Sequence, residues 1–276
     1  MSIGDAATGE AEPDERQLAP VRIGPGIRAK NMLRTFSNYV LDVFLPPVCL
    51  GWEARLDAHD ALCPACWRTI DFIRPPLCDC LGIPMPYDTG GRMLSAAAVA
   101  DPPNYDRARA VARYDGLMRD LIHDFKFRDT HDARALFGRW LSEAGAALIA
   151  ECDVIIPVPL ARWRLLTRRF NQSQILAAEI AKRTGKPVAP FSLIRVRTTK
   201  SQVGLSRTER RRNVAGAFAV APGQLTSVAG NAVLLIDDVV TTGATASSAA
   251  RALKKAGAAR VDVLALALAG DGAVIP

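Results

Sequence analysis

The sequence predicts an α/β protein with a mainly parallel sheet and flanking helices, preceded by a small cysteine-rich module. Two observations lead to this prediction. From Tyr105 onward, strand-like and helix-like patterns alternate, which is typical of parallel strands joined through helices. Before that point, five of the six cysteines lie between Cys49 and Cys80, in a proline-rich region without long periodic runs. A region of that kind is expected to be held together by something other than a large apolar core.

The expected elements follow one another along the chain. Short apolar runs predict strands at 109–114, 153–157, 214–220, 232–236 and 261–268. Helical periodicity predicts helices at 136–150, 170–185 and 244–257. No internal repeat is visible. The predicted domains are a disordered leader at 1–30, an amphipathic helix (31–45) plus the cysteine-rich module at 31–104, and the α/β domain at 105–276.

Composition limits the cellular setting. The chain has 276 residues, of which 49% are hydrophobic, and its longest apolar runs are much shorter than a membrane span. The first 30 residues lack the cationic start and apolar core of a signal peptide. We therefore expect a soluble cytoplasmic protein without a membrane partner. In a reducing cytosol, clustered cysteines indicate metal or redox chemistry more often than disulfides.

Positive charge is concentrated in one segment. The net charge is +7, and between Arg162 and Arg212 there are 11 arginines and 3 lysines against only two acids, Glu179 and Glu209. Arginine favours planar recognition of phosphate, so the bias predicts an anionic ligand. The alternative is a solvated face that only aids solubility.

The cysteine spacing predicts a zinc site. Cys63-Pro-Ala-Cys66 is a C-x-x-C pair, and zinc requires two further thiolates or imidazoles from a distant segment. Cys49 with one of Cys78 or Cys80 is the expected source, and His59 is a spare candidate. Two alternatives stay open: thiols without metal, and, with less support, a redox pair. Cys152 stands alone before a strand and is expected to be buried.

The stretch VLLIDDVVTTGAT, at 233–245, combines two acids with a polar turn. Its apolar run is typical of a parallel strand covered on both faces, and such a strand delivers its carboxyl end to a ligand crevice. Asp237 and Asp238 there suit vicinal hydroxyls or a hydrated magnesium ion. The turn at 241–245, with Gly243, opens a helix whose backbone N–H groups can bind a phosphate monoester. The combination predicts a ribose 5-phosphate.

Three other interpretations of the glycine and acid motifs are weaker. A strand ending in two acids also occurs in nucleoside triphosphatases, but those need a G-x-x-x-x-G-K-S/T loop, which this sequence lacks. The segment at 24–29 mimics a dinucleotide fingerprint, but no strand precedes it. An ordinary strand and helix with capping acids would not require two acids, three threonines and a glycine.

Three segments together carry a family resemblance. The stretch at 233–245 resembles the phosphoribosyl pyrophosphate (PRPP) signature of type I phosphoribosyltransferases. PVPLARWRLLTRRFNQ at 157–172 and RTTKSQVGLSRTERRRNVAGAF at 197–218 resemble the ComF family, which is associated with DNA uptake. The resemblance covers 44–268 and implies a type I phosphoribosyltransferase fold after a four-cysteine zinc module. This chain departs from the module pattern, because Trp52 stands where a C-x-x-C pair would end, Cys80 is one place off, and a later cysteine pair is replaced by SAAA at 95–98.

The resemblance also implies roles for single residues. Asp237, Asp238 and Lys200 would be catalytic, and Lys200 would lie on a mobile segment, 200–212, that closes over the leaving group. The residues implied in PRPP binding, with magnesium, are Asp237, Asp238, Val239, Thr241, Thr242, Gly243, Ala244, Thr245, Pro159, Leu160, Arg162, Arg168 and Arg169. The residues implied in zinc binding are Cys49, Cys63, Cys66, Cys78 and Cys80.

The sequence leaves the acceptor open, and with it whether catalysis occurs. No segment outside the predicted PRPP site identifies an acceptor base or amine. The competing hypothesis is a non-catalytic DNA-uptake adaptor, in which the basic segment and the module hold single-stranded DNA or a helicase partner. Aromatic side chains for base stacking are scarce there, with only Trp163 and Phe170 nearby.

Overall fold

The computed structural model describes residues 47–52, 54–127, 133–160, 170–197 and 206–270. The predicted leader and the helix at 31–45 lie outside these residues. So do four of the predicted site residues, namely Arg162, Arg168, Arg169 and Lys200. Among the described residues, no helix has the length and apolar character needed to cross a membrane.

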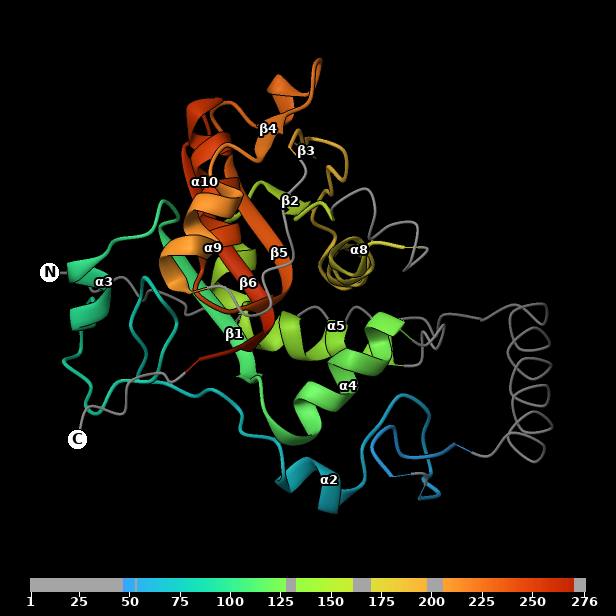
Figure 1. The fold of residues 1–276 in the computed structure, drawn as a ribbon. Helices are drawn as coiled ribbons and strands as arrows, with labels where there is room; N and C mark the ends of the chain where they lie inside the picture. The colour runs from blue at the N-terminus through green and yellow to red at the C-terminus, as the bar shows by residue number, and fades with distance from the viewer. Residues whose placement is uncertain (1–46, 53, 128–132, 161–169, 198–205, 271–276) are drawn as a thin grey trace, which may run out of the picture. The chain divides into compact units, whose positions relative to one another are not determined.

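A four-stranded parallel sheet forms the centre of the α/β part (Figure 1). Its strands lie in the order β1 (Arg107–Arg113), β6 (Arg260–Leu268), β5 (Ala232–Val240) and β2 (Val154–Pro157). All three neighbouring pairs are parallel, so the predicted fold class is confirmed. The order places β5 between β6 and β2, and its carboxyl end carries the two acids.

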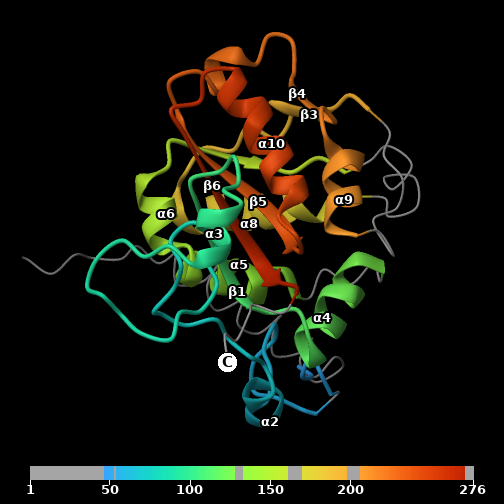
Figure 2. The ribbon, with the colours of Figure 1, turned by 60° about the vertical axis from the view of Figure 1, so that its left-hand side comes forward.

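Helices cover both faces of the sheet, as Figures 1 and 2 show. One face is covered by α4 (Gly116–Phe127), α5 (Ala133–Ala144), α6 (Ala146–Glu151) and α8 (Gln172–Thr184). The other is covered by α10 (Ala244–Lys255) and the antiparallel pair β3 (Leu193–Arg195) and β4 (Phe218–Val220). Along β5, Leu234 packs on the first face and Leu235 on the second. A continuous apolar run is therefore what this central strand requires.

The helix predicted at 136–150 is wrong in one respect, because it is two helices separated by Gly145. A side chain at Gly145 would place its Cβ 2.4 Å from Leu264 Cδ2 of β6 and 3.0 Å from the carbonyl oxygen of Leu141. The chain passes so close to the sheet here that only glycine is accommodated without displacing its neighbours.

The strand predicted at 214–220 is also wrong in its extent. Val214 is the last residue of α9 (Arg207–Val214), and only β4 is extended, paired with β3 rather than with the main sheet. The helix begins with a capping box, in which the side chains of Ser206 and Glu209 accept each other's backbone N–H. Residues 207–212, expected to belong to a mobile segment, are therefore helical, with Ser206 as the N-cap, while 198–205 lie outside the described residues.

Sequence reasoning missed α4, although its apolar residues recur at helical spacing. Met118, Leu121, Ile122 and Phe125 are all buried against the first face of the sheet. The short helices α2 (Pro64–Arg68) and α3 (Ala96–Ala100) and the 3-10 turn at Leu225–Ser227 were missed as well.

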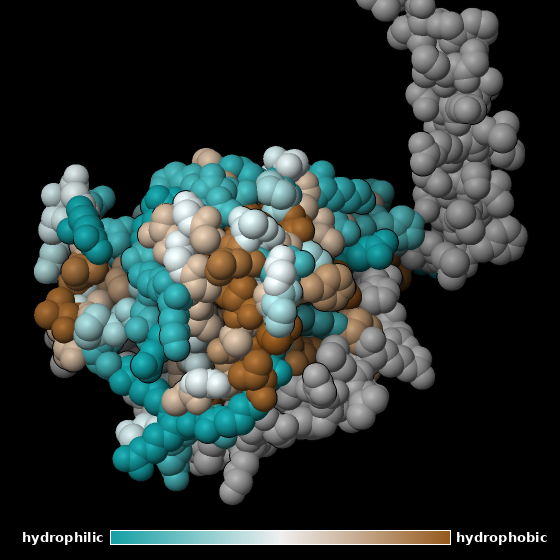
Figure 3. Space-filling model, turned by 90° about the horizontal axis from the view of Figure 1, so that it is seen from above, coloured by the Kyte–Doolittle hydropathy of each residue, from teal (hydrophilic) through white to brown (hydrophobic). Residues whose placement is uncertain are grey.

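The cysteine-rich module packs on α5 through aromatic rings. Trp67 of α2 lies 4.8 Å from Phe72 and 5.7 Å from Trp140 of α5, measured between ring centroids. The domain boundary near residue 104 stays a prediction. On the face shown in Figure 3, apolar side chains form a band through the middle and a smaller group at the left edge, with hydrophilic side chains between them.

Candidate functional site

Asp237 and Asp238 lie where β5 extends beyond the end of its neighbour β2. Pairing with β2 ends at Pro157 opposite Ile236, and the last contact on that side is the Val158 N–H donating to the Ile236 carbonyl at 2.9 Å. On the other side β5 keeps pairing with β6 up to Val240. The strand is thus four residues longer than predicted, and the acids lie within it, with no β2 partner beside them. This places both carboxyl groups at the edge where α/β proteins bind ligands.

Each acid contacts a different helix. The Ser173 hydroxyl of α8 donates to Asp237 Oδ1 at 3.4 Å, and that oxygen also accepts the Asp238 N–H at 2.9 Å. Lys126, in the last turn of α4, places its Nζ 2.8 Å from Asp238 Oδ2. Helices α4 and α8 therefore hold the acids from the same face of the sheet.

The two carboxylates carry more negative charge than this site compensates. Burial, together with the charge of Asp238, raises the pKa of Asp237 to about 7. One ammonium faces two acids, which leaves one negative charge uncompensated when both are ionised, so the site attracts a cation. The donor set, two carboxylates at the end of a strand, consists of the oxygen ligands that magnesium prefers.

The raised pKa has a consequence for stability. We expect Asp237→Asn to stabilise the ligand-free protein at pH 8 by about 1–3 kcal/mol. A folded-state pKa above the unfolded value, about 3.9, means that the folded state binds the proton more tightly. The stability of the wild type therefore falls as pH rises from about 4 to about 7, and the asparagine variant escapes this loss.

Urea denaturation at pH 8 and pH 5 measures this effect. The gain should be larger at pH 8, and the exposed change Asp120→Asn should alter stability by less than about 0.5 kcal/mol at either pH. If Asp237→Asn lowered the free energy of unfolding at pH 8, the Asp237 carboxylate would not be an unfavourably buried charge.

The turn after β5 has the geometry of an anion site. Gly243 has φ 71° and ψ 0°, a left-handed conformation that glycine adopts without strain, and α10 begins at the next residue. The first turn of a helix leaves N–H groups without intrahelical acceptors. Thr242 Oγ1 is buried and has no hydrogen-bond partner among the described residues. A buried hydroxyl without a partner is unfavourable, so a ligand oxygen here would satisfy it.

A cavity of about 250 Å³ adjoins this turn. Its lining residues include Thr242, Gly243 and Ala244 at the turn, together with Tyr105, Arg211 and Arg251. Neither acid is among its lining residues. The cavity thus belongs to the phosphate side of the predicted site rather than to the acid side.

Three consecutive residues at the start of α8 connect the parts of the site. The Asn171 amide donates to the Val158 carbonyl after β2, the Gln172 amide to the Lys126 carbonyl, and the Ser173 hydroxyl to Asp237. Gln172 and Ser173 are buried, which is unusual for polar residues, and sequence reasoning did not assign them to the site because burial depends on the tertiary fold. Lys126 was missed too, because only the tertiary fold brings it to the acids.

The structure brings most of the predicted residues to one edge of the sheet. Asp237, Asp238, Val239 and the turn at 241–245 follow each other on β5 and α10, and Pro159 and Leu160 follow the end of β2. The described part of the chain leaves out the arginines at 162, 168 and 169 and the lysine at 200.

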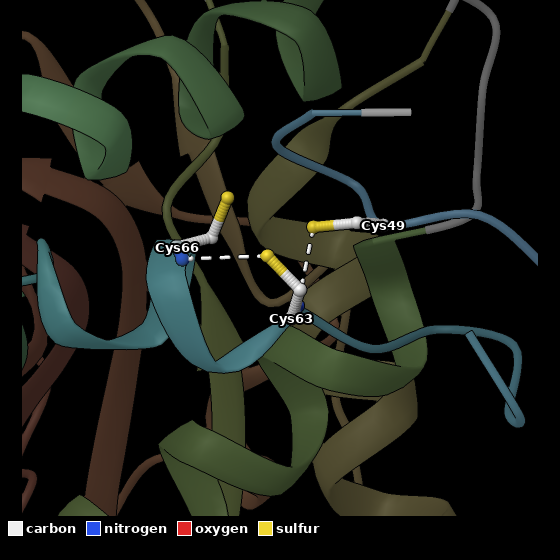
Figure 4. Close-up of side chains that lie close together, drawn as sticks. All are labelled: Cys49, Cys63 and Cys66. Carbon is white, nitrogen blue, oxygen red and sulfur yellow. Dashed lines mark hydrogen bonds between the residues drawn. The ribbon is translucent and has the colours of Figure 1, made fainter. Parts of the chain in front are cut away.

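Three cysteines form a cluster in the module (Figure 4). The Sγ atoms of Cys49, Cys63 and Cys66 lie within 4.8 Å of one another. The Cys63 N–H donates to Cys49 Sγ at 3.2 Å, and the Cys66 N–H to Cys63 Sγ at 3.5 Å. Burial and the neighbouring sulfurs raise the pKa of Cys66 to about 12. Burial by itself would raise the pKa of Cys49, but backbone N–H groups that donate to its sulfur lower the pKa to about 7. The three thiols fit a zinc ion, whose ligands in a tetrahedron of 2.3 Å bonds are roughly 3.8 Å apart.

The remaining thiol candidates are not part of this cluster. Among the described residues, the only grouping of three close metal-ligand side chains is the one above, and it contains neither Cys78, Cys80 nor His59. Cys152 is buried, as expected.

Comparison with known proteins identifies two family models along the chain. A double zinc ribbon domain matches residues 40–98, and a phosphoribosyl transferase domain matches residues 172–274. The second match covers the start of α8, the acids and the turn. The α/β part thus has the phosphoribosyltransferase fold, preceded by a zinc-ribbon-like module.

Several relatives align with most of this chain and with most of their own length. The DNA utilization protein YhgH of Salmonella typhimurium is 31% identical over 232 residues, spanning 80% of this chain and 97% of that protein. Competence protein F of Haemophilus influenzae is 29% identical over 227 residues, spanning 80% of this chain and 96% of that protein. Competence protein ComFC of Bacillus subtilis is 28% identical over 213 residues, spanning 75% of this chain and 85% of that protein.

Proposed function

Because the chain belongs to the ComF family of competence and DNA-utilization proteins, and because its acids and its phosphate-type turn lie on one strand edge, we propose that it binds PRPP together with magnesium. The observation that carries the proposal is the run from Asp237 to Thr245. It would bring acceptors for a diol next to a helix start, where the buried Thr242 hydroxyl has no partner among the described residues.

Different residues of the site would bind different parts of PRPP. Asp237 and Asp238 would accept hydrogen bonds from the ribose hydroxyls. The N–H groups of the turn and the Thr242 hydroxyl would bind the 5-phosphate. Of the two arginines that line the adjoining cavity, Arg251 would add positive charge, while Arg211 is paired with Asp101 in the ligand-free protein. Pro159 and Leu160, which follow β2, would border the pyrophosphate.

Magnesium, when bound, would neutralise phosphate charge in this ligand. Lys126 already neutralises one of the two acids, so the pair would not repel the ligand with its full charge. If ribosyl transfer occurs, pyrophosphate departs from an oxocarbenium-like ribose, and the cationic groups would stabilise its charge. The acceptor stays open.

Calorimetric titration tests the proposal. PRPP should bind with magnesium and should lose most of its affinity with EDTA, while pyrophosphate alone should bind more weakly because it lacks the ribose phosphate. Absence of PRPP binding in magnesium would overturn the proposal.

We also propose that Cys49, Cys63 and Cys66 hold a zinc ion. Their clustered sulfurs and N–H···S bonds support this, since such bonds stabilise thiolates. The ion would fix the contact between the module and α5 rather than take part in chemistry.

A second candidate function, binding of single-stranded DNA, has support from surface charge. Exposed basic side chains gather on two adjacent helices, Arg211 and Arg212 on α9 and Arg251 and Lys255 on α10. Such a surface binds phosphodiester backbones with strong salt dependence. Fluorescence anisotropy of a labelled oligonucleotide at rising salt, with and without PRPP, separates this function from PRPP binding.

A further inference from the structure

The cysteine-rich module consists of two halves with the same local architecture, although the sequence shows no repeat. In the first half, Cys63 is the N-cap of the five-residue helix α2, and its side chain accepts the Cys66 N–H. In the second half, Ser95 is the N-cap of the five-residue helix α3, and its side chain accepts the Ala98 N–H. Ser95 thus stands at the place of Cys63, and Ala98 at the place of Cys66.

The contact to the preceding segment repeats as well. The Cys63 N–H donates to Cys49 Sγ at 3.2 Å, and the Ser95 N–H donates to Cys78 Sγ at 3.2 Å. Cys78 therefore stands at the place of Cys49. In the first half all three positions carry thiols, whereas in the second only Cys78 does.

Apolar packing occupies the second half where a metal would otherwise be expected. Cys78, Cys80 and Ala98 are buried together, and Leu81, Ile83 and Met85 pack against them. Leu81 is three residues after Cys78, at the place where a C-x-x-C pair would end. Serine and alanine do not supply the thiolates or imidazoles that zinc requires. Among the described residues, no group of three close metal-ligand side chains includes Cys78 or Cys80.

Polar contacts to β1 add a second means of holding this half. Arg109 Nη2 lies 3.0 Å from Asp79 Oδ1, and Nη1 donates to the Asp79 carbonyl at 3.1 Å. Asp79 Oδ2 accepts the Met93 N–H at 3.0 Å, which closes the loop between the two chain segments. Gly82 passes so close to β1 that an added Cβ would lie 2.6 Å from the Ala108 carbonyl oxygen.

From these observations we infer that the second half of the module is a metal-free copy of the first. Its apolar cluster and the Asp79–Arg109 pair stabilise it in place of an ion. The chain therefore holds one zinc ion, at Cys49, Cys63 and Cys66, where the family model describes a double ribbon. The count of one rests on the zinc site proposed above, but the metal-free second half does not.

Metal content of the full chain tests the inference, with zinc measured by elemental analysis after gel filtration. Wild type should contain one zinc per chain. Cys78→Ala/Cys80→Ala should retain it, and Cys63→Ser should lose it. A wild type with two zinc ions, one of which is lost on changing Cys78, would overturn the inference.

A gain of metal tests the equivalence of the two halves directly. Ser95→Cys/Ala98→Cys restores three thiols with Cys78, so its zinc content should rise from one to two per chain. The matched control Ser95→Ala should stay at one. If the double variant folds and stays at one, the positions are not equivalent and the inference fails.

Hydrogen exchange over 77–100 separates the two claims. Protection of this segment should survive a chelator. Loss of protection together with zinc would overturn the metal-free assignment. A wild type without zinc but with a protected segment would refute the zinc site at the first half and support the inference for the second.

Discussion

Replacing both Asp237 and Asp238 with asparagine is expected to weaken magnesium-dependent PRPP binding at least a hundredfold. Each carboxylate would accept a charge-assisted hydrogen bond, worth about 1.5–3 kcal/mol, from a ribose hydroxyl or from metal-bound water. Losing two such bonds removes roughly 3–6 kcal/mol, and 1.4 kcal/mol corresponds to a factor of ten in affinity. Calorimetric titration, fitted to one PRPP molecule per chain, measures the change in affinity.

The controls separate loss of the site from loss of the fold. Asp57→Asn/Asp120→Asn removes the same two charges from exposed positions and should leave PRPP affinity unchanged. The site variant should still unfold in one cooperative transition, because the gain expected from Asp237→Asn offsets part of the cost of leaving the Lys126 ammonium without Asp238. Equal affinity of the site variant and the wild type would remove the acids from the site.

The acids and the turn were predictable because their chemistry is local in sequence. An apolar run predicts a buried strand, and a polar turn with glycine predicts a helix start. The elements β5 and α10 can therefore be found without tertiary information. The extent of β5 was not predictable, because it depends on where β2 ends. Pairing partners, not propensity, decide where a strand stops.

One of the two errors in the fold has a tertiary cause, and the other has a local one. The break at Gly145 comes from Leu264 on a distant strand, and alanine-rich sequence on both sides of it favours a continuous helix. The segment ending at Val214 is rich in arginine and lacks apolar periodicity, yet Ser206 and Glu209 stabilise a helix start there. The capping box was a sequence signal that the charge of the segment obscured.

The most informative missed residue is Lys126, whose role is set by burial. Its Nζ lies 2.8 Å from Asp238 Oδ2, and the two side chains are 14% and 15% exposed. Lys254 and Asp106 are also 2.8 Å apart, but they are 36% and 38% exposed. The two pairs therefore differ in solvation and not in distance, so they form a matched comparison.

Lys126→Met should lower the free energy of unfolding of the ligand-free protein by about 2–4 kcal/mol, because it leaves Asp238 as a poorly solvated charge without a partner. Lys254→Met should cost less than about 1 kcal/mol, because water solvates Asp106 once the pair is broken. Urea denaturation of both variants gives the comparison, and similar costs for the two would contradict the role of burial.

A double-mutant cycle assigns the cost to the pair. Adding Asp238→Asn to Lys126→Met should recover part of the loss, with a coupling of at least about 1 kcal/mol, because the uncompensated charge is then gone. Magnesium should raise the melting temperature of Lys126→Met more than that of the wild type, since the ion would supply the positive charge that the ammonium supplied. Strictly additive effects, or no difference in the magnesium response, would mean that Lys126 and the cation do not share Asp238. In that case the Lys126 ammonium would not be the group that stabilises the Asp238 carboxylate before magnesium binds.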